Sequence, residues 1–280
     1  MEILRTVQEL RERVRADRKQ GSTIGLVPTM GALHAGHASL IRAARTECGL
    51  VAVSIFVNPT QFGPNEDYSR YPRTFEADCA LANAEGANVV FAPLVEELYP
   101  SGAATFVEVE GLSGRLDGAS RPGHFRGVAT VVSKLLIAAE ADLAFFGQKD
   151  AAQVAVLRRM VADLLLPAKI VVCPIVREPD GLALSSRNVY LSATERPQAL
   201  VLNRSVRQAE RMVAMGERRA AMLIQEARRI FAAEPAARVD YIELVDWNTL
   251  LPVDTAAPGT LFAVAAWVGA TRLIDNTVVG

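Results

Sequence analysis

Cysteine and histidine are scarce in this chain of 280 residues, which contains three of each. The cysteines, Cys48, Cys79 and Cys173, are odd in number and far apart, which argues against a disulfide framework and against a cysteine-based metal or redox site. We expect reduced, partly buried thiols of the kind usual in cytoplasmic proteins. The sequence therefore predicts a cytoplasmic location.

Long apolar runs and an excess of one charge are also missing. Runs such as LVAVSIFV fall far short of the roughly 20 residues that span a bilayer, and the charged N-terminal segment lacks the apolar core of a signal peptide. The 30 basic residues nearly balance the 31 acidic ones. We therefore expect neither a membrane nor a nucleic acid as partner.

The composition supports a large buried core, because 50% of the residues are hydrophobic and 22% are charged. The first part of the chain alternates short β-branched runs with segments of helical periodicity, which is typical of βαβ units. We predict strands at 23–28, 50–57, 89–92, 141–146 and 169–173, and helices at 37–48, 75–85, 128–139 and 150–165. This pattern predicts an α/β fold with a Rossmann-like, doubly wound parallel sheet.

The pattern changes after Val176, where a Pro-Asp-Gly turn precedes two amphipathic helices and three strand-like runs. The helices are expected at 199–215 and 218–233, and the strands at 239–245, 261–268 and 272–275. We predict a Rossmann-like domain over residues 1–176 and a smaller α+β domain over 177–280, with the boundary near 175–185.

Two of the three histidines, His34 and His37, fall in one short stretch between the first predicted strand and the helix after it. Ligands of open parallel sheets bind at the carboxyl ends of the strands. A helix N-terminus there offers N–H groups and a positive dipole end to an anion. Gly31 and Gly36 allow close approach of the backbone, so the stretch predicts a phosphate-binding turn.

Other interpretations of these residues stay open at this point. Zinc ligation by His34 and His37 needs further ligands, and the sequence has no HExxH motif and no cysteine cluster. The third histidine, His124, is in isolation best explained as a hydrogen-bonded core or surface residue. A dinucleotide fingerprint and a P-loop are both absent, so neither explains the glycines.

Three further segments place polar side chains at predicted strand ends or at the domain boundary. They are VNPTQF at 57–62, FGQKD at 146–150 and LSSRN at 184–188. The guanidinium of Arg187 matches phosphate geometry, and hydroxyls supply shorter contacts. Lys149 taken alone is best explained as a solvated lysine at a helix start, but the common position of the three segments favours a shared site.

Five blocks in order resemble one known family: VPTMGALHAGHASLI, FVNPTQFGPNEDYSRYPRT, FFGQKDAAQ, VREPDGLALSSRNVYL and TRLIDN. The chain is similar along nearly its whole length to the pantoate–β-alanine ligases (pantothenate synthetases), which belong to the HxGH nucleotidylyltransferase superfamily. The resemblance implies an enzyme that condenses (R)-pantoate with β-alanine, consumes ATP with Mg²⁺, and releases AMP and pyrophosphate by way of pantoyl adenylate. It also implies a homodimer.

The resemblance assigns most of the site residues to ATP. His34, His37, Lys149 and Arg187 are the implied catalytic residues, and the implied ATP-binding set is Met30, Gly31, Ala32, Leu33, His34, Ala35, Gly36, His37, Gly147, Gln148, Lys149, Asp150, Val176, Leu184, Ser185, Ser186 and Arg187. The implied pantoate and β-alanine contacts are Gln61, Gln153, Asn58, Tyr71 and Arg121. Asp78 is a candidate Mg²⁺ ligand, with a solvated helix aspartate as the alternative.

The chain departs from the family pattern at four of these positions. Ala151 and Ala152 stand where an aromatic residue and glutamine are frequent, Leu184 where methionine is common, and Gln148 where glutamate is frequent. The first three are apolar changes that we expect to alter packing. We further expect the domain after Val176 to act as a lid, since an acyl adenylate needs a site that excludes water.

Two rival functions are compatible with part of the sequence. An adenylyltransferase of the same superfamily, of the phosphopantetheine or nicotinate-mononucleotide type, accounts for the HAGH element but not for Gln61, Gln153 or the C-terminal domain. A non-catalytic nucleotide-binding module is disfavoured because His34, His37, Lys149 and Arg187 are all present.

Overall fold

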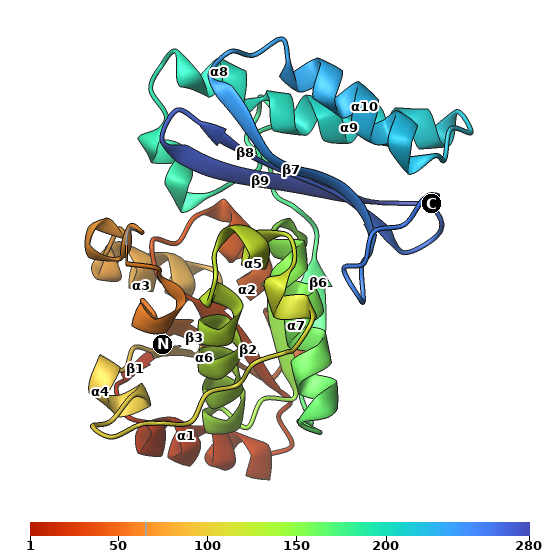
Figure 1. Ribbon diagram of the computed structural model, residues 1–280. Helices are drawn as coiled ribbons and strands as arrows, with labels where there is room; N and C mark the ends of the chain where they lie inside the picture. Colours follow the sequence, from red (N-terminus) through yellow and green to blue (C-terminus); the bar gives the residue numbers. More distant parts are fainter. Residues whose placement is uncertain (65) are drawn as a thin grey trace. The chain divides into compact units, whose positions relative to one another are not determined.

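The computed structural model describes residues 1–64 and 66–280, and its contacts divide the chain into two compact units (Figure 1). The N-terminal unit comprises Met1–Gly147 and Val156–Pro174, and the C-terminal unit comprises Gln148–Ala155 and Ile175–Gly280. The main break falls between Pro174 and Ile175, and the sequence expectation places a domain boundary near 175–185. The grouping of the short segment Gln148–Ala155 with the C-terminal unit is a difference from the sequence expectation.

A six-stranded parallel sheet forms the centre of the N-terminal unit, in the order β1-β4-β3-β2-β5-β6. Its strands are β1 (Glu2–Leu4), β2 (Ile24–Thr29), β3 (Leu50–Ile55), β4 (Val89–Phe91), β5 (Leu143–Gly147) and β6 (Lys169–Cys173). This topology confirms the predicted doubly wound sheet. It also supplies β1, which the sequence did not predict because a strand of three residues beginning with an exposed glutamate has no clear periodicity.

Helices cover both faces of this sheet (Figure 1). The N-terminal unit contains α1 (Val7–Lys19), α2 (Ala35–Glu47), α3 (Phe75–Ala84), α4 (Val95–Leu98), α5 (Asp117–Ser120) and α6 (His124–Ala138), with the 3₁₀ turns η2 (Tyr68–Arg70) and η3 (Leu112–Gly114). Because parallel crossovers are right-handed, α2 and α3 lie on one face, and α1 and α6 on the other. The α2 face packs Ile41 and Ala44 against the buried strand residues Val27, Val53 and Val90.

The strand order reverses between β2 and β5. From β2 the chain moves to β3 on one side, and it later adds β5 on the opposite side of β2. Such a switch point is where open α/β sheets bind their ligands, at the carboxyl ends of the strands. The segments beginning at Met30, Phe56 and Gln148 follow β2, β3 and β5, three adjacent strands.

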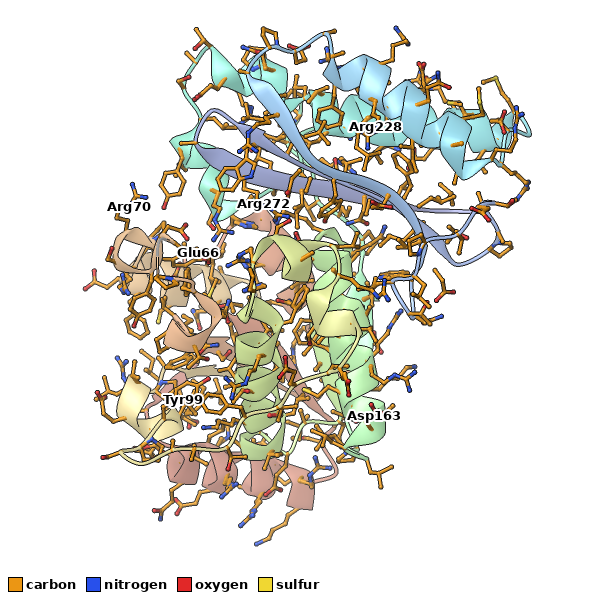
Figure 2. The ribbon with its side chains drawn as sticks, viewed as in Figure 1. Glu66, Arg70, Tyr99, Asp163, Arg228 and Arg272 are labelled. Carbon is orange, nitrogen blue, oxygen red and sulfur yellow. The ribbon has the colours of Figure 1, made fainter. Side chains whose placement is uncertain are left out.

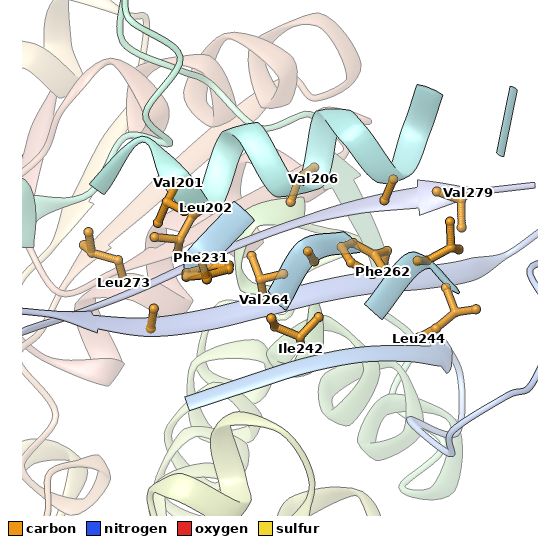
Figure 3. Close-up of a cluster of buried hydrophobic side chains, with 14 of the residues drawn as sticks. Val201, Leu202, Val206, Phe231, Ile242, Leu244, Phe262, Val264, Leu273 and Val279 are labelled. Carbon is orange, nitrogen blue, oxygen red and sulfur yellow. The ribbon is translucent and has the colours of Figure 1, made fainter. Parts of the chain in front are cut away.

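The C-terminal unit is built on a three-stranded antiparallel sheet, β7 (Ala237–Asp246), β8 (Thr260–Val268) and β9 (Thr271–Val279). Helices α8 (Glu195–Ala199), α9 (Val201–Ala214) and α10 (Ala220–Phe231) complete it. Side chains such as Leu202, Val206, Phe231, Phe262 and Val264 form its apolar core between α9, α10 and the sheet (Figure 3). The predicted smaller α+β domain is thereby confirmed.

The helices and the cysteines of the described residues bear on the sequence expectations about membranes and disulfides. Over residues 1–64 and 66–280, no helix is both long and apolar enough to cross a bilayer. All three cysteines are free, with Cys48 and Cys173 buried. Burial raises the pKa of Cys48 to about 11, so this thiol stays protonated and unreactive near neutral pH.

Candidate functional site

Residues 30–37, named the HAGH turn here, join β2 to α2 and include two consecutive residues with left-handed backbone conformation, Gly31 (φ +84°) and Ala32 (φ +50°). A Cβ atom at Gly31 would lie 2.9 Å from Oδ2 of Asp78 and 3.2 Å from Cγ2 of Ile55. Glycine is therefore required at Gly31 by both conformation and space. The turn brings the N-terminus of α2 to the carboxyl edge of the sheet, as the sequence predicted.

Asp78 holds this turn from the first turn of α3. Its Oδ2 accepts the N–H of Ala32 at 3.0 Å, and its Oδ1 accepts the N–H of Leu33 at 2.8 Å and the hydroxyl of Thr74 at 3.0 Å. Asp78 is 2% exposed. Successive backbone N–H groups in such a turn form an anion-binding concavity, and here it is filled by the protein's own carboxylate.

His34 and His37 cap the start of α2 with their ring nitrogens. Nδ1 of His34 accepts the N–H of Gly36 at 3.1 Å, and Nδ1 of His37 accepts the N–H of His34 at 3.3 Å. A ring nitrogen that accepts carries no proton, so in each neutral imidazole the proton is on Nε2. The ring centroids are 4.2 Å apart. Both imidazoles therefore carry an Nε2–H donor at the helix N-terminus.

Gln61 lies on the 3₁₀ turn η1 (Pro59–Gln61), directly after β3, with its side-chain amide held at both ends. Nδ2 of Asn58 donates to Oε1 of Gln61 at 3.0 Å, and Nε2 of Gln61 points at Sδ of Met30 at 3.0 Å. Since Met30 follows β2, the Gln61 amide lies next to the HAGH turn. Its amide is oriented with the NH₂ group toward that turn.

Tyr99 and Gly127 hold Asn58 in turn. The hydroxyl of Tyr99, which is labelled in Figure 2, donates to Oδ1 of Asn58 at 2.9 Å. The second hydrogen of Asn58 Nδ2 goes to the Gly127 carbonyl at 3.1 Å. Burial raises the pKa of Tyr99, so its hydroxyl remains a donor. A Cβ at Gly127 would lie 2.3 Å from the Thr60 carbonyl oxygen, so α6 packs directly on η1 because this position lacks a side chain.

Arg121 and His124 contact the backbone of Gln61. Nδ1 of His124 lies 2.8 Å from the Gln61 carbonyl oxygen and must donate to it, while Nε2 lies 3.0 Å from Nη1 of Arg121. Arg121 also forms an ion pair with Glu66 at 2.6 Å. Burial alone would raise the pKa of Glu66, but the Arg121 hydrogen bonds and charge outweigh it and lower that pKa. Arg121 is therefore committed to Glu66 and to the Gln61 turn.

Tyr71, the remaining substrate candidate of the N-terminal unit, is buried. Its ring meets that of Phe62 edge to face with centroids 5.8 Å apart, one residue beyond Gln61. This contact places Tyr71 beside the η1 turn.

The C-terminal unit contains the other candidates. Gln148, Lys149 and Asp150 form the 3₁₀ turn η4 (Gln148–Asp150), and Gln153 lies at the start of α7 (Ala151–Asp163). Nζ of Lys149 is 3.6 Å from Oδ1 of Asp150. Gly147, the last residue of β5, belongs to the N-terminal unit. The apolar departures Ala151 and Ala152 are buried in this first turn of α7.

The segment from Val176 to Arg187 folds back on itself around the Pro-Asp-Gly turn. The N–H of Leu184 donates to the Val176 carbonyl at 3.0 Å, and Ser185 caps η5 (Ser186–Tyr190) by accepting the N–H of Arg187 at 3.3 Å. Ser186 and Arg187 therefore begin a short helical turn in the same unit as Lys149.

Asp78 is the sequence candidate for a metal ligand, but its carboxylate oxygens are occupied by hydrogen bonds and are not open to a divalent ion. Both of its oxygens already accept N–H or O–H groups, and its burial leaves no room for the waters that Mg²⁺ usually retains. In the part of the chain that the structure describes, no three His, Cys, Asp or Glu side chains cluster as metal ligands. Asp78 therefore does not fit the role of a Mg²⁺ ligand.

The sequence as a whole matches one family of known proteins. The model of the family "Pantoate-beta-alanine ligase" matches residues 2–278. The pantothenate synthetase of Acidobacterium capsulatum is 61% identical over 284 aligned residues, covering 100% of this chain and 95% of the relative. The pantothenate synthetase of Koribacter versatilis is 58% identical, covering 99% of this chain and 96% of the relative.

The chain belongs to the pantoate–β-alanine ligase family. Among solved structures, the pantothenate synthetase of Thermus thermophilus matches with a TM-score of 0.94 at 46% identity, covering 99% of each chain. The ligase of Francisella tularensis, solved in complex with "Beta-gamma ATP and Beta-alanine", matches with a TM-score of 0.81 at 35% identity, covering 99% of this chain and 97% of that one.

Family membership confirms the resemblance on which the sequence interpretation rested and disfavours the adenylyltransferase and non-catalytic alternatives. Three supporting residues were missed by that interpretation: Asp78 as an anchor of the HAGH turn, Tyr99, and Asn276. Each is a buried or half-buried polar residue whose partners are distant in sequence. The TRLIDN block drew attention to Asn276, but no local pattern indicated what any of the three residues holds.

Proposed function

We propose that the chain condenses pantoate with β-alanine at the expense of ATP, by way of pantoyl adenylate. One observation carries the proposal: the HAGH turn presents two imidazole Nε2–H donors, and the oriented amide of Gln61 lies beside the same turn. A phosphate-binding element and a hydroxy-acid-binding element thus meet at the switch point of the sheet.

In the first step the pantoate carboxylate attacks the α-phosphorus of ATP and pyrophosphate leaves. Negative charge builds up on the α-phosphoryl oxygens and on the departing pyrophosphate, and donors fixed in advance stabilise it. In the N-terminal unit the Nε2–H groups of His34 and His37 fill this role. Lys149, Ser185, Ser186 and Arg187 are the corresponding donors of the C-terminal unit.

Pantoate is bound by neutral amides. Because Asn58 donates to Oε1 of Gln61 and one hydrogen of Gln61 Nε2 points at Sδ of Met30, the amide offers its second NH₂ hydrogen to the substrate. A neutral donor can fix the pantoate oxygens without neutralising the carboxylate that has to attack. Gln153 is proposed to hold pantoate from α7. Asn58, Tyr71 and Arg121 contribute chiefly by holding the Gln61 turn.

In the second step the β-alanine amine attacks the acyl carbon and AMP leaves. Mg²⁺ is proposed to enter with ATP, bound to its phosphate oxygens and to water, because Mg²⁺ prefers such ligands to an all-protein cage. This assignment agrees with the full occupation of the Asp78 carboxylate by backbone and hydroxyl donors.

Omission of single substrates tests the proposed function. Purified protein is incubated with ATP, Mg²⁺, pantoate and β-alanine, and AMP and pyrophosphate are measured as each organic substrate is left out. We expect sustained AMP release only with both. Continued pyrophosphate release without AMP, with another acceptor, would instead identify an adenylyltransferase.

The C-terminal unit is proposed to act as a lid during the second step. The proposal is supported by the division of the ATP-binding candidates between the two units, which requires both to approach one nucleotide. Small-angle scattering of the protein alone and with ATP, Mg²⁺ and pantoate measures the change. We expect a smaller radius of gyration in the complex, and an unchanged profile would contradict a large closure.

Assembly as a homodimer and a cytoplasmic location are also proposed, on the family resemblance. Light scattering after size-exclusion chromatography measures the first, and a monomer of 30.2 kDa at micromolar concentration would contradict it. Fractionation of the source cells measures the second, and recovery with the membrane fraction would contradict it.

Tyr99→Phe is expected to raise the KM for pantoate about fivefold, because one net hydrogen bond is worth about 1 kcal/mol. The variant removes the donor that fixes Oδ1 of Asn58, while Thr60 still donates to that atom. The KM for ATP should not change. Tyr68→Phe, a tyrosine of the same unit that lies outside this network, is the matched control; equal effects of the two variants would exclude a specific role for Tyr99.

A further inference from the structure

The TRLIDN block near the end of the chain has no part in the chemistry described so far. Its last two residues, Asp275 and Asn276, lie on β9, an edge strand of the antiparallel sheet. They are 2% and 3% exposed. Burying a carboxylate and an amide is costly unless both are fully hydrogen-bonded, so their partners indicate what they do.

Asn276 binds the backbone of the η4 turn. Its Nδ2 donates to the carbonyl oxygens of Gln148 at 3.0 Å and of Lys149 at 2.9 Å. Its Oδ1 accepts Nε2 of Gln148 at 3.3 Å. One amide thus satisfies two adjacent carbonyls at the point where the Lys149 side chain leaves the backbone. The Gln148 departure is explained by the same contact, since glutamine can donate to Oδ1 of Asn276 and glutamate cannot.

Asp275 holds the segment that leads to Ser185 and Arg187, two of the proposed phosphate donors. Its carboxylate accepts hydrogen bonds from both Nη atoms of Arg177, at 2.6 and 2.9 Å. Its Oδ1 also accepts a hydrogen bond from the backbone N–H of Asn276 at 2.8 Å. Arg177 donates to the Gly181 carbonyl at 3.1 Å and forms an antiparallel bridge with Ala183. The chain continues from Ala183 directly into Ser185 and Arg187.

We infer that Asp275 and Asn276 are positioning residues that hold Lys149 and the Ser185–Arg187 segment at a fixed spacing within the C-terminal unit. The inference rests on the proposed binding of ATP phosphates by those donors. Asp275 and Asn276 thereby keep the proposed phosphate donors of this unit at a constant distance from one another. A displacement of about 1 Å at such donors can cost roughly 10²-fold in rate.

Asn276→Asp tests the inference with almost no change in volume. The variant lacks both N–H donors and places a carboxylate against two carbonyl oxygens. We expect the kcat of pyrophosphate release from ATP and pantoate to fall roughly 10–100-fold, with a smaller rise in the KM for ATP. The reaction of isolated pantoyl adenylate with β-alanine should keep its rate, since pyrophosphate has already left. Equal slowing of both half-reactions would overturn the inference in favour of a general structural role.

A double-mutant cycle with Lys149→Ala gives an independent readout. If Asn276 acts through Lys149, the double variant is no slower in adenylation than Lys149→Ala alone. If the two losses of adenylation rate multiply in the double variant, Asn276 does not act through Lys149. Thr277→Val is the matched control, because Thr277 is a buried neighbour on β9 whose hydroxyl donates to Glu210 instead; its half-reactions should stay unchanged.

Asn276→Ala replaces the aspartate variant if that protein does not fold, as judged by circular dichroism. The alanine removes the donors without adding charge, and the same split between the half-reactions is expected. Unchanged adenylation in a folded Asn276→Ala protein would refute the positioning role. Failure of the proposed function would be recognised separately, because the wild-type protein would then release no AMP with pantoate and β-alanine.

Discussion

Replacing His37 with alanine is expected to slow the formation of pantoyl adenylate by roughly 10²–10³-fold, the usual cost of losing one preorganised donor to a developing anion. The structure gives the physical reason. Nδ1 of His37 accepts the N–H of His34, so the ring proton is on Nε2 and the imidazole acts as a donor. Isotope exchange between pyrophosphate and ATP in the presence of pantoate measures the step directly.

Two conservative variants of His37 separate its donor from its capping role. Asparagine places an oxygen near the position of Nδ1 and can keep the bond from the His34 N–H, but it has no group at Nε2. Glutamine reaches the Nε2 position with an N–H donor and gives up the cap. We expect His37→Gln to retain more adenylation activity than His37→Asn, and thermal stability to rank the other way. The opposite order of activities would assign His37 to the helix cap and remove it from the chemistry.

The architecture could be predicted because it depends on local patterns. β-branched runs alternate with helical periodicity through the first five predicted strands, and each of these corresponds to a strand of the parallel sheet. The predicted elements are wrong where a strand is too short to show a pattern, or where one helical pattern spans two helices. β1 has three residues, and the helix predicted over 199–215 is interrupted at Leu200, so that α8 and α9 are separate. β9 extends to Val279 because β8 pairs with it along its whole length, which no local run of residues shows.

The site was predictable only as far as its residues follow strands. His34 and Gln61 come shortly after β2 and β3, respectively, so the parallel topology brings their segments to one edge of the sheet. The supporting residues come from elsewhere. Asp78 is distant in sequence from the turn that it holds, and Asn276 lies more than a hundred residues from Lys149. Such pairings are set by tertiary packing, and a single sequence carries no signal for them.

Replacing Asp78 should be among the most damaging substitutions in the N-terminal unit. In Asp78→Ala the partly buried N–H groups of Ala32 and Leu33 lose their acceptors, each at a cost of about 1–3 kcal/mol. The free energy of unfolding should therefore fall by about 2–6 kcal/mol, as measured by urea denaturation. The left-handed conformation at Ala32 is held by one of these bonds, so the HAGH turn should relax and displace His34 and His37.

Asp78→Asn separates the effect on the turn from the effect on the fold. The amide keeps the volume and one acceptor, but its NH₂ group faces one of the two backbone N–H donors. We expect kcat/KM for ATP to fall roughly 10²-fold, as for a displacement of about 1 Å, while the KM for β-alanine changes little. Glu76→Gln, which removes a charge from the same turn of α3 at an exposed position, is the matched control and should have wild-type rates.

The Mg²⁺ dependence of Asp78→Asn decides between its two possible roles. If Asp78 anchors the HAGH turn, the variant keeps the wild-type Mg²⁺ requirement, and the lost activity does not return at high Mg²⁺. If Asp78 is instead a metal ligand, the Mg²⁺ concentration for half-maximal rate rises and excess Mg²⁺ restores turnover. We expect the first result, because two backbone N–H groups and the Thr74 hydroxyl already occupy the carboxylate. Recovery at high Mg²⁺ would return Asp78 to the metal site that its sequence position first suggested.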